Sequence, residues 1–230
     1  MKTRLFLPLV IVFAASLLAD EPKPVAVWSF EEASGDIAKD VTGNGNDGVI
    51  KNTDASKCRV QGIVGKAIDL NGGYIEIPDA KRLNLPGPIT VCAWIKPTEG
   101  RTHMAIFCKK GDVQPLGYRF SFAWSRVFFE IGDGTEKFRT SSEGWSVPAG
   151  FWSHVAATYD GKTTRLYRNA QLIKEEEVTG PIAPLDRPMV IGAYLGRKDA
   201  YNFKGLLDQL KIFDRAISPE GIFALTDFAK

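Results

Sequence analysis

The sequence is poor in the residues that build zinc sites and disulfide scaffolds. Its 230 residues contain 3 cysteines and 2 histidines, and no Cys-x-x-Cys or Cys/His metal spacing occurs. A zinc site is therefore not expected, because such sites need several closely spaced Cys and His ligands. The small, odd number of cysteines also excludes a fold held together mainly by disulfides.

A surplus of charge of one sign is also lacking. Lys and Arg number 29 against 27 Asp and Glu, which gives a net charge of +2, and no basic run has interleaved aromatic residues. Nucleic acid is therefore not an expected partner. The 22 glycines and 13 prolines are spread evenly along the chain, which is typical of many turns rather than of a disordered region.

The N-terminus carries the pattern of a targeting segment. Lys2 and Arg4 flank the start of an apolar stretch over 5–18, and Ala19 stands before the acidic Asp20. This pattern predicts a signal peptide over residues 1–19. The stretch is too short for a comfortable membrane span. We therefore expect an exported protein, extracellular, periplasmic or at the cell surface, without a membrane span after cleavage. An uncleaved anchor is the alternative.

The rest of the chain alternates short apolar runs with turn signals. Three pairs of runs read as hairpins: 67–70 with 74–78, 89–96 with 104–109, and 118–124 with 127–131. The runs 152–159, 164–168 and 171–178 read as three consecutive strands. Helix is predicted from Ser218, an N-cap followed by Pro219 and by Glu220 in the first turn. About a dozen short strands without a linker-like stretch indicate one all-β sandwich.

Two cysteines lie symmetrically about a turn near Gly100. Cys92 and Cys108 fall in the second predicted hairpin, where they would face each other at disulfide distance. An oxidising compartment would permit the bond. We therefore predict a Cys92–Cys108 disulfide with Cys58 free. The alternative is that these cysteines are small buried residues of a core.

Asp208 poses a question of charge. Alternation in its predicted strand places it on one face with Leu206, Leu210 and Ile212, and that mostly aliphatic face should be buried. A buried carboxylate is costly unless its charge is compensated, and no Lys, Arg or His shares the face. Asp208 therefore needs either a bound cation or a set of backbone N–H donors.

An ordered series of motifs runs through the chain. It includes Trp28-Ser-Phe-Glu31, Asp40-x-Thr-Gly-Asn-Gly-Asn46-x-Gly48, Ile89-Thr-Val-x-Ala-Trp94, Trp152-x-His154-Val-Ala-x-Thr-Tyr159 and Phe203-x-Gly205-x-x-Asp208. In this order and spacing, the series resembles the LamG-like jelly-roll domains of the concanavalin A-like lectin/glucanase superfamily, over residues 25–226. The resemblance implies a two-sheet antiparallel jelly-roll sandwich, which the short C-terminal helix predicted above would follow. Ala170 stands where the family usually has the Gly of an Asn-Gly turn, which leaves the turn type open, since Ala disfavours positive φ.

The resemblance also implies a calcium ion at the rim of the sandwich. It would bring the loop 40–47 beside the Asp208 strand, so that Asp40, Asn46 and Asp208 become the metal ligands. Calcium takes carboxylate and amide oxygens, and its charge would offset that of the buried Asp208. The alternative is that Asp40 and Asn46 only brace turns.

No catalytic constellation is apparent. Glucanases of the superfamily carry a Glu-x-Asp-x-Glu strand, whereas the nearest pattern here, Glu130-Ile-Gly-Asp133-Gly-Thr-Glu136, has a different spacing. His154 lies within a strand motif, and His103 lies in a polar loop without a paired nucleophile. We therefore expect no catalytic residues and a protein that is not an enzyme.

Binding is the expected function, because aromatic faces and polar groups on jelly rolls recognise sugars. Trp28, Trp94 and Trp152 occupy strand positions of the fold, whereas Trp124 and Trp145 lie in a turn and a loop and are the candidate ligand-binding residues. We expect an exported carbohydrate- or glycoconjugate-binding module. The alternatives are a structural or adhesive cell-surface domain that binds a protein, and an enzyme that acts on glycans. A rim pocket of aromatic and amide side chains would favour the first, and a flat apolar patch the second.

Overall fold

The computed structural model describes residues 22–227 except 79, 101, 112, 145 and 196–200. The predicted signal peptide over 1–19 lies outside the described residues. Within the described part of the chain, no helix has the length and apolar character to cross a membrane.

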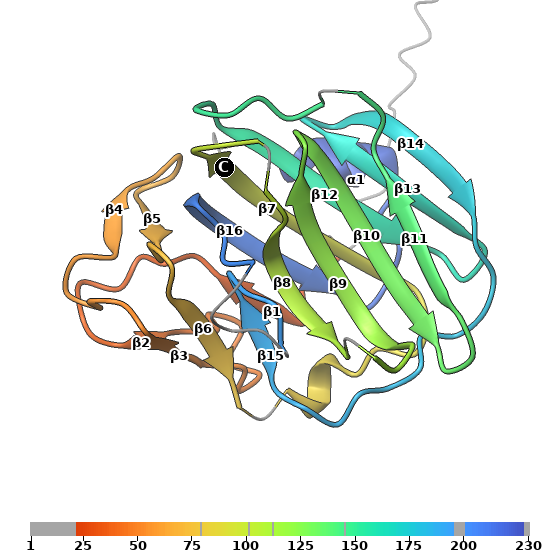
Figure 1. Cartoon of the computed structure of the whole chain (residues 1–230), viewed down its shortest axis with the longest axis horizontal. Coiled ribbons are helices and arrows are strands. Elements are labelled where there is room, and N and C mark those ends of the chain that lie inside the picture. The colour runs from red at the N-terminus through yellow and green to blue at the C-terminus, as the bar shows by residue number, and fades with distance from the viewer. Residues whose placement is uncertain are drawn as a thin grey trace, which may run out of the picture.

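Two antiparallel sheets of eight strands each form a sandwich (Figure 1). The first sheet runs in the order β14 (Gln171–Glu177), β13 (Thr163–Arg168), β12 (Ser153–Tyr159), β7 (Ile89–Pro97), β16 (Gly205–Phe213), β5 (Lys66–Asp69) and β4 (Arg59–Gln61), with β1 (Ala26–Trp28) paired to β16. The second sheet runs in the order β11 (Lys137–Ser141), β10 (Arg126–Asp133), β9 (Leu116–Ala123), β8 (Met104–Lys110), β15 (Met189–Ile191), β6 (Tyr74–Ile77), β3 (Gly48–Lys51) and β2 (Ile37–Ala38). The predicted jelly-roll sandwich is confirmed.

The core lies between the sheets and follows strand alternation. In β9 and β10, Phe120, Phe122 and Phe129 are fully buried in the core cluster, while Arg119 and Glu130 alternate with them and project from the other face. Burial of each such aromatic side chain contributes about 1.5–3 kcal/mol. This alternation leaves the outer face of the second sheet available for polar and aromatic side chains.

Some of the predicted hairpins are correct and two are wrong. The pairs β9–β10, β12–β13 and β13–β14 form as expected. In contrast, β5 and β6 belong to different sheets, as do β7 and β8. The turn at Asn71 to Gly73 and the loop near Gly100 therefore carry the chain from one sheet to the other. Turn residues mark a reversal of the chain, but they do not specify whether the next strand pairs with the previous one.

This crossover also overturns the predicted disulfide. Cys92 packs with Tyr167 and Ile222 in a cluster of the first sheet, whereas Cys108 packs with Val190 in a cluster of the second sheet. Both are free thiols, as is Cys58, and all three are buried. Burial raises the pKa of Cys92 to about 12. These cysteines therefore act as small apolar residues, the alternative stated above.

The C-terminal helix forms as predicted. After a short 3-10 turn earlier in the chain, η1 (Lys81–Leu83), the only α-helix of the described residues is α1 (Pro219–Ala224). Its N-cap is Ser218, whose Oγ accepts a hydrogen bond from the Gly221 N–H at 3.2 Å. The helix buries Ile222 against the outer side of the first sheet.

The turn that lacks the family's glycine keeps a left-handed geometry. Asn169 has φ of 46° and Ala170 has φ of 64°, so both central residues adopt the conformation of a type I′ turn. The Asn169 side chain accepts a hydrogen bond from the His154 N–H at 2.9 Å, which holds the turn against β12. Ala170 thus changes the strain of the turn but not its type.

Candidate functional site

Three connections between strands meet at one rim of the sandwich and enclose a cleft of about 720 Å³. These connections follow β5, precede β8 and precede β16. They are tied together by hydrogen bonds: Asn202 Nδ2 donates to the Gly72 carbonyl at 2.8 Å, and the Thr98 N–H donates to the Lys204 carbonyl at 3.0 Å. The side chains that line the cleft include Asn71, Thr98, Thr102, His103, Tyr201 and Asn202.

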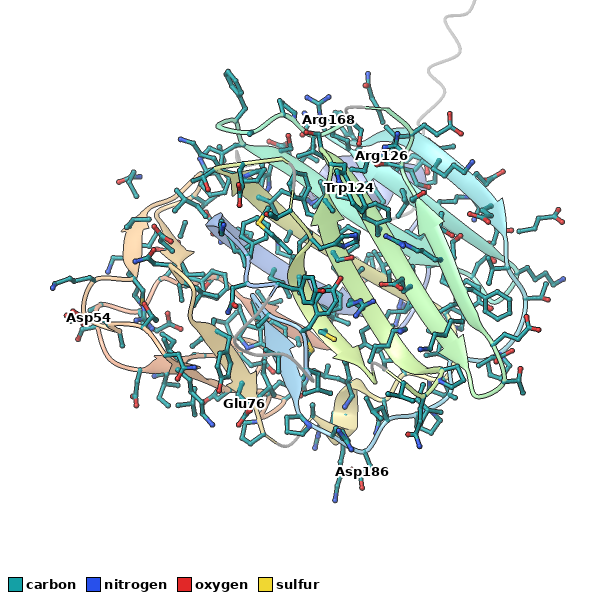
Figure 2. All side chains as sticks on the ribbon, viewed as in Figure 1. Asp54, Glu76, Trp124, Arg126, Arg168 and Asp186 are labelled. Atoms are coloured by element: carbon teal, nitrogen blue, oxygen red, sulfur yellow. The ribbon has the colours of Figure 1, made fainter. Side chains whose placement is uncertain are left out.

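Trp124, at the tip of the β9–β10 hairpin (Figure 2), contacts His103, one of the residues that line this cleft. The two turn residues, Trp124 and Ser125, have φ of 50° and 55°. A type I′ turn normally takes Asn and Gly there, and a bulky residue with positive φ is strained. The turn is held by two hydrogen bonds, from Ser125 N–H to the Gly100 carbonyl at 2.8 Å and from Val147 N–H to the Ser125 carbonyl at 2.9 Å. Strain retained by surrounding structure is frequent at functional sites, and here it presents an indole with 51 % of its surface exposed.

His103 links Trp124 to the cleft. Its ring meets the Trp124 indole edge to face with centroids 4.4 Å apart, and it stacks on Phe128 at 5.7 Å. Tyr201, 38 % exposed, meets the His103 ring edge to face at 6.4 Å and stacks on Tyr194 at 4.7 Å. A half-exposed indole and a partly exposed phenol ring therefore both contact one imidazole of the cleft.

A buried ion pair supports these aromatic rings from below. Arg119 Nε and the Glu130 carboxylate are 2.6 Å apart, and the Arg119 guanidinium lies 3.9 Å from the ring centre of Tyr194. The Tyr194 hydroxyl in turn lies 3.4 Å from His103 Nδ1. The aromatic side chains thus rest on groups that fix their orientation.

Electrostatics keep the His103 ring neutral. Burial lowers the pKa of His103 and the nearby Arg139 lowers it further; Glu130 raises it, and Arg119 lowers it by a smaller amount. At neutral pH the imidazole is therefore uncharged, and because Nδ1 faces the Tyr194 hydroxyl, Nε2 is the ring nitrogen that can donate or accept a further hydrogen bond. Together with the amides of Asn71 and Asn202, the cleft carries aromatic faces and uncharged hydrogen-bonding groups.

Glu130 and Asp133 belong to the segment that was compared above with a glucanase strand, and both carboxylates have structural partners. Glu130 is paired with Arg119. Asp133 Oδ1 accepts from the backbone N–H groups of Thr135 and Glu136, both at 2.7 Å, as in an Asx turn. His154 is buried beside Trp94, and burial lowers its pKa to about 3. These groups therefore have structural partners or surroundings rather than a catalytic arrangement.

Of the two tryptophans predicted to bind ligand, Trp124 lies at the cleft and Trp145 lies outside the described residues. Sequence reasoning missed His103 and Tyr201 as members of the site. His103 was assigned to a polar loop, and nothing in its local sequence shows that this loop meets Tyr201, almost a hundred positions later. The available signal was the position of Trp124 between two strand patterns, because it places that residue at a turn.

The loop 40–47 is built around Asp40. Its Oδ1 accepts from the N–H groups of Val27 and Thr42, both at 3.1 Å, and its Oδ2 accepts from Asn46 Nδ2 at 2.7 Å. Burial alone would raise the pKa of Asp40, but these hydrogen bonds outweigh it and lower the pKa. Asn46 also donates to the Val25 carbonyl at 3.2 Å, while its own Oδ1 is buried without a donor. Asp40 and Asn46 therefore lie together, bound to β1.

Asp208 is buried under a different loop. Its Oδ2 accepts from the N–H groups of Ile63 and Val64 at 3.0 and 3.1 Å. Its Oδ1 is buried and has no hydrogen-bond donor. Burial raises the pKa of Asp208 to about 6 although the backbone N–H groups of Val64, Ile63 and Gln209 lower it, and the nearby negative charge of Glu31 acts in the same direction as burial. Backbone donors, one of the two alternatives from the sequence, thus satisfy one oxygen of Asp208 and leave the other without a partner.

The face predicted for Asp208 is wrong because the strand contains a bulge. The register between β16 and β7 shifts after Asp208, and Gln209 has φ of 48°. The bulge breaks simple alternation, so that Leu206 does not share the core face. The side chains of β16 that reach the core are Leu207, Leu210 and Ile212.

The predicted calcium ligands therefore divide into two places. Asp40 and Asn46 bind β1, and Asp208 binds the turn at Gly62 to Gly65. Among the described residues, no group of three His, Cys, Asp or Glu side chains is placed to hold a metal. The donor that fits a cation is Asp208 Oδ1, a buried anionic oxygen without a partner, and the charge of the Glu31 carboxylate acts on the same residue.

An antiparallel jelly roll with an aromatic cleft at its rim defines the class of this protein. The model of the family described as the concanavalin A-like lectin/glucanases superfamily matches residues 69–223, and the chain belongs to this superfamily. The resemblance stated from the sequence is thereby confirmed.

Comparison with known proteins gives partial relatives. The chain is 31 % identical to mouse (Mus musculus) pappalysin-1 over 91 residues, which is 38 % of this chain and 6 % of pappalysin-1. Domain 4 of AbnA, an extracellular arabinanase from Geobacillus stearothermophilus solved with arabinotriose, is 24 % identical over 90 % of this chain and 100 % of that domain, with a TM-score of 0.71. A ligand-binding domain of botulinum neurotoxin serotype D, solved with N-acetylneuraminic acid, is 13 % identical over 88 % and 50 % of the two chains, with a TM-score of 0.66. At these identities, the two structures bear on the fold alone.

Proposed function

We propose that this chain is an exported carbohydrate- or glycoconjugate-binding module and that its binding site is the cleft beside Trp124. The observation that carries the proposal is the half-exposed indole held in a strained turn next to His103, Tyr201 and the amide groups of the cleft. An aromatic face stacks on the apolar face of a sugar ring, while amides and a neutral imidazole exchange hydrogen bonds with its hydroxyls.

Two similar structures support this proposal. One similar domain was solved with arabinotriose and another with N-acetylneuraminic acid. Both ligands are saccharides, and both proteins share the sandwich fold of this chain. We infer the same broad class of ligand here, because the cleft of this chain independently carries aromatic and amide groups.

We propose that the module has no catalytic activity. Glycoside hydrolysis needs two carboxyl groups about 5–10 Å apart on either side of the bond that is cleaved. The cleft itself includes Asp69, whose Oδ1 accepts from the Asn71 N–H at 3.0 Å, and the outer face includes Glu130, which is paired with Arg119. Neither carboxylate stands free beside a second one, which supports a binding role.

The alternative of a protein-binding domain finds less support. Such a role would be favoured by a contiguous apolar patch. The large hydrophobic side chains that are most exposed lie instead on separate elements of the described chain, and they include Val41, Val113, Phe151, Leu172 and Phe223.

We further propose that a calcium ion binds at Asp208, with Oδ1 as its ligand and Glu31 as the neighbouring carboxylate. Asn46, with an amide oxygen that lacks a donor, stays a candidate ligand of the loop 40–47, and Asp40 is proposed to brace that loop. The ion would supply the positive charge that a buried carboxylate requires, and its role would be structural.

A glycan array probed with the secreted protein, in millimolar calcium and in EDTA, tests the proposed function. We expect a defined group of oligosaccharides to bind. Retention of no glycan, together with capture of a surface protein that Trp124→Ala does not affect, would contradict the proposal. Mass spectrometry of the secreted protein tests export: the predicted N-terminus is Asp20, and an intact Met1 in secreted material would contradict cleavage.

A further inference from the structure

The outer face of the second sheet carries a row of charged side chains next to the proposed site. Arg139 on β11 lies opposite Glu130 on β10, and Glu130 lies opposite Arg119 on β9. Along its own strand, each of the three alternates with residues that face the core. All three side chains therefore project from the outward face of the sheet. The row thus contains two guanidinium groups and one carboxylate.

The single carboxylate of this row is already neutralised. Glu130 Oε2 lies 2.6 Å from Arg119 Nε and 2.5 Å from Arg119 Nη2, a two-pronged contact with both side chains largely buried. This ion pair, in which two nitrogens share one carboxylate oxygen, accounts for the charge of Glu130. The positive charge of Arg139 is therefore left in surplus.

Arg139 is held in place without an anionic partner. Its guanidinium lies 4.1 Å from the ring centre of Phe128, and the residue is exposed. Within the described part of the chain, no carboxylate forms an ion pair with Arg139. A guanidinium stacked on an aromatic ring keeps the N–H groups of its edge free for a planar or tetrahedral anion.

A second arginine lies at the start of β10, close to Phe128 in sequence. Arg126 is two positions before Phe128 on the same face, is exposed and, among the described residues, has no carboxylate partner either. Figure 2 shows Arg126 beside Trp124. The aromatic cluster is thus bordered by positive charge on the side of β10 and β11.

The positive charge of Arg139 acts on His103, a residue that lines the cleft. The ring of His103, which touches Trp124, is stacked on the same Phe128 that carries Arg139. The field of Arg139 contributes to the lowered pKa of His103, second only to burial. A ligand seated on Trp124 would therefore lie within reach of a fixed positive field.

We infer that the glycan bound at the Trp124 cleft carries a carboxylate or sulfate group, which Arg139 receives while a sugar ring rests on Trp124. This inference rests on the proposed function and specifies its ligand class as acidic oligosaccharides. Arg126 adds to the attraction at the edge of the site.

Isothermal titration calorimetry with two matched pairs of probes tests the inference. The first pair is trigalacturonic acid and its methyl ester, which differ in the carboxylate charge. The second is a heparin-derived tetrasaccharide and its fully desulfated form. The desulfated tetrasaccharide keeps its uronic carboxylates, so the second pair tests the sulfate groups alone. In at least one pair, we expect the member that carries the tested anionic group to bind about tenfold or more tightly than its counterpart, since hydrogen bonds to a charged group are stronger than those to a neutral one. The pair that shows the preference identifies the anionic group.

Variants separate a specific contact from general attraction. Arg139→Gln should reduce the affinity ratio within the pair that shows the preference about tenfold, and Arg139→Lys should restore it only in part, because Lys keeps the charge but loses the planar fork. Arg82→Gln, at η1, removes the same charge elsewhere and should leave the ratio unchanged. Equal binding of both members of each pair, or an equal effect of Arg82→Gln, would overturn the inference while the proposed function stands. Binding of no glycan of any kind would overturn both.

Discussion

The indole of Trp124 meets the imidazole of His103 edge to face, with ring centroids 4.4 Å apart. This contact joins the tip of the β9–β10 hairpin to the loop before β8. The turn fixes the backbone of Trp124 with φ of 50°, and the contact with His103 restrains its side chain, which stays 51 % exposed. We infer that the exposed part of the indole is thereby held ready for a ligand, which reduces the entropy lost on binding.

The buried ion pair beneath the site should be essential for stability. Arg119→Met would leave the Glu130 carboxylate buried and unpaired, so we expect the free energy of unfolding to fall by about 3–5 kcal/mol. The double variant Arg119→Met/Glu130→Leu should recover most of this loss. Arg165→Gln, in the more exposed pair with Glu175, should cost no more than about 1 kcal/mol. Urea denaturation measures all three, and a double variant no more stable than Arg119→Met would contradict the account.

Gly62 makes room for the carboxylate of Asp208. A Cβ at this position would lie 2.5 Å from Asp208 Oδ2 and 2.6 Å from the Lys66 carbonyl carbon. Gly62→Ala should therefore destabilise the fold by about 1–3 kcal/mol, as overpacking does. Gly87→Ala is the matched control, because nothing lies within 4 Å of its Cβ. Equal stability of the two variants in urea denaturation would show that the turn does not press on Asp208.

Calcium should stabilise the protein through Asp208. At free calcium one hundred times its dissociation constant, binding would add about 2.7 kcal/mol. For a domain of this size, that corresponds to a rise in melting temperature of about 2–4 °C per kcal/mol. Asp208→Asn should abolish most of the difference between EDTA and calcium, as followed by thermal denaturation.

Asp40→Asn is the control for this calcium prediction. Its carboxylate accepts five hydrogen bonds within the loop and from β1, so the variant should melt lower in EDTA and in calcium alike. If Asp40→Asn instead abolishes the calcium response, the three-ligand site expected from the sequence is correct. A wild type that melts identically in both solutions would exclude calcium binding.

His154 should make stability depend on acid pH. Burial, and then the positive charge of Lys211, lower the pKa of His154 from 6.5 to about 3, so the folded state binds fewer protons than the unfolded state. The contribution of the neutral His154 side chain to the free energy of unfolding is fully present above pH 6.5 and is lost as pH falls from 6.5 toward 3. By pH 5 the loss should be about 2 kcal/mol. The free energies of unfolding of wild type and His154→Gln are measured by urea denaturation at pH 7.5 and pH 5. The difference between the two proteins should shrink by about 2 kcal/mol at the lower pH. A difference that stays constant would contradict this prediction.

The sandwich was predictable from the sequence because its signals are local and repeated. Strand alternation, the turns at Asp160-Gly161 and Asn169-Ala170, and the cap at Ser218 each act over a few residues, and the structure confirms them. The pairing of β7 with β12 and β16, rather than with β8, depends on contacts more than fifty residues apart. A turn signal contains no information on such pairing, and the disulfide prediction for Cys92 and Cys108 failed for this reason.

The site was predictable only in part, for a similar reason. Trp124 could be selected because it falls between two strong strand patterns. His103 and Tyr201 enter the site through loops that meet only after both sheets have formed, and a single sequence does not record that encounter. The surroundings of Asp208 depend on a bulge at Gln209, a polar residue whose positive φ has no sequence signal comparable to a glycine.

The most direct test of the account is the affinity of Trp124→Ala for the glycan that binds best on the array, measured by isothermal titration calorimetry. Loss of an aromatic platform at the centre of a binding site should weaken affinity at least about tenfold, or 1.4 kcal/mol. Leu172→Ala on β14 of the other sheet is the matched control, since Leu172 is 52 % exposed against 51 % for Trp124, and it should bind as the wild type does. If Trp124→Ala, folded by its melting temperature, binds the glycan as tightly as Leu172→Ala, the cleft beside Trp124 is not the binding site.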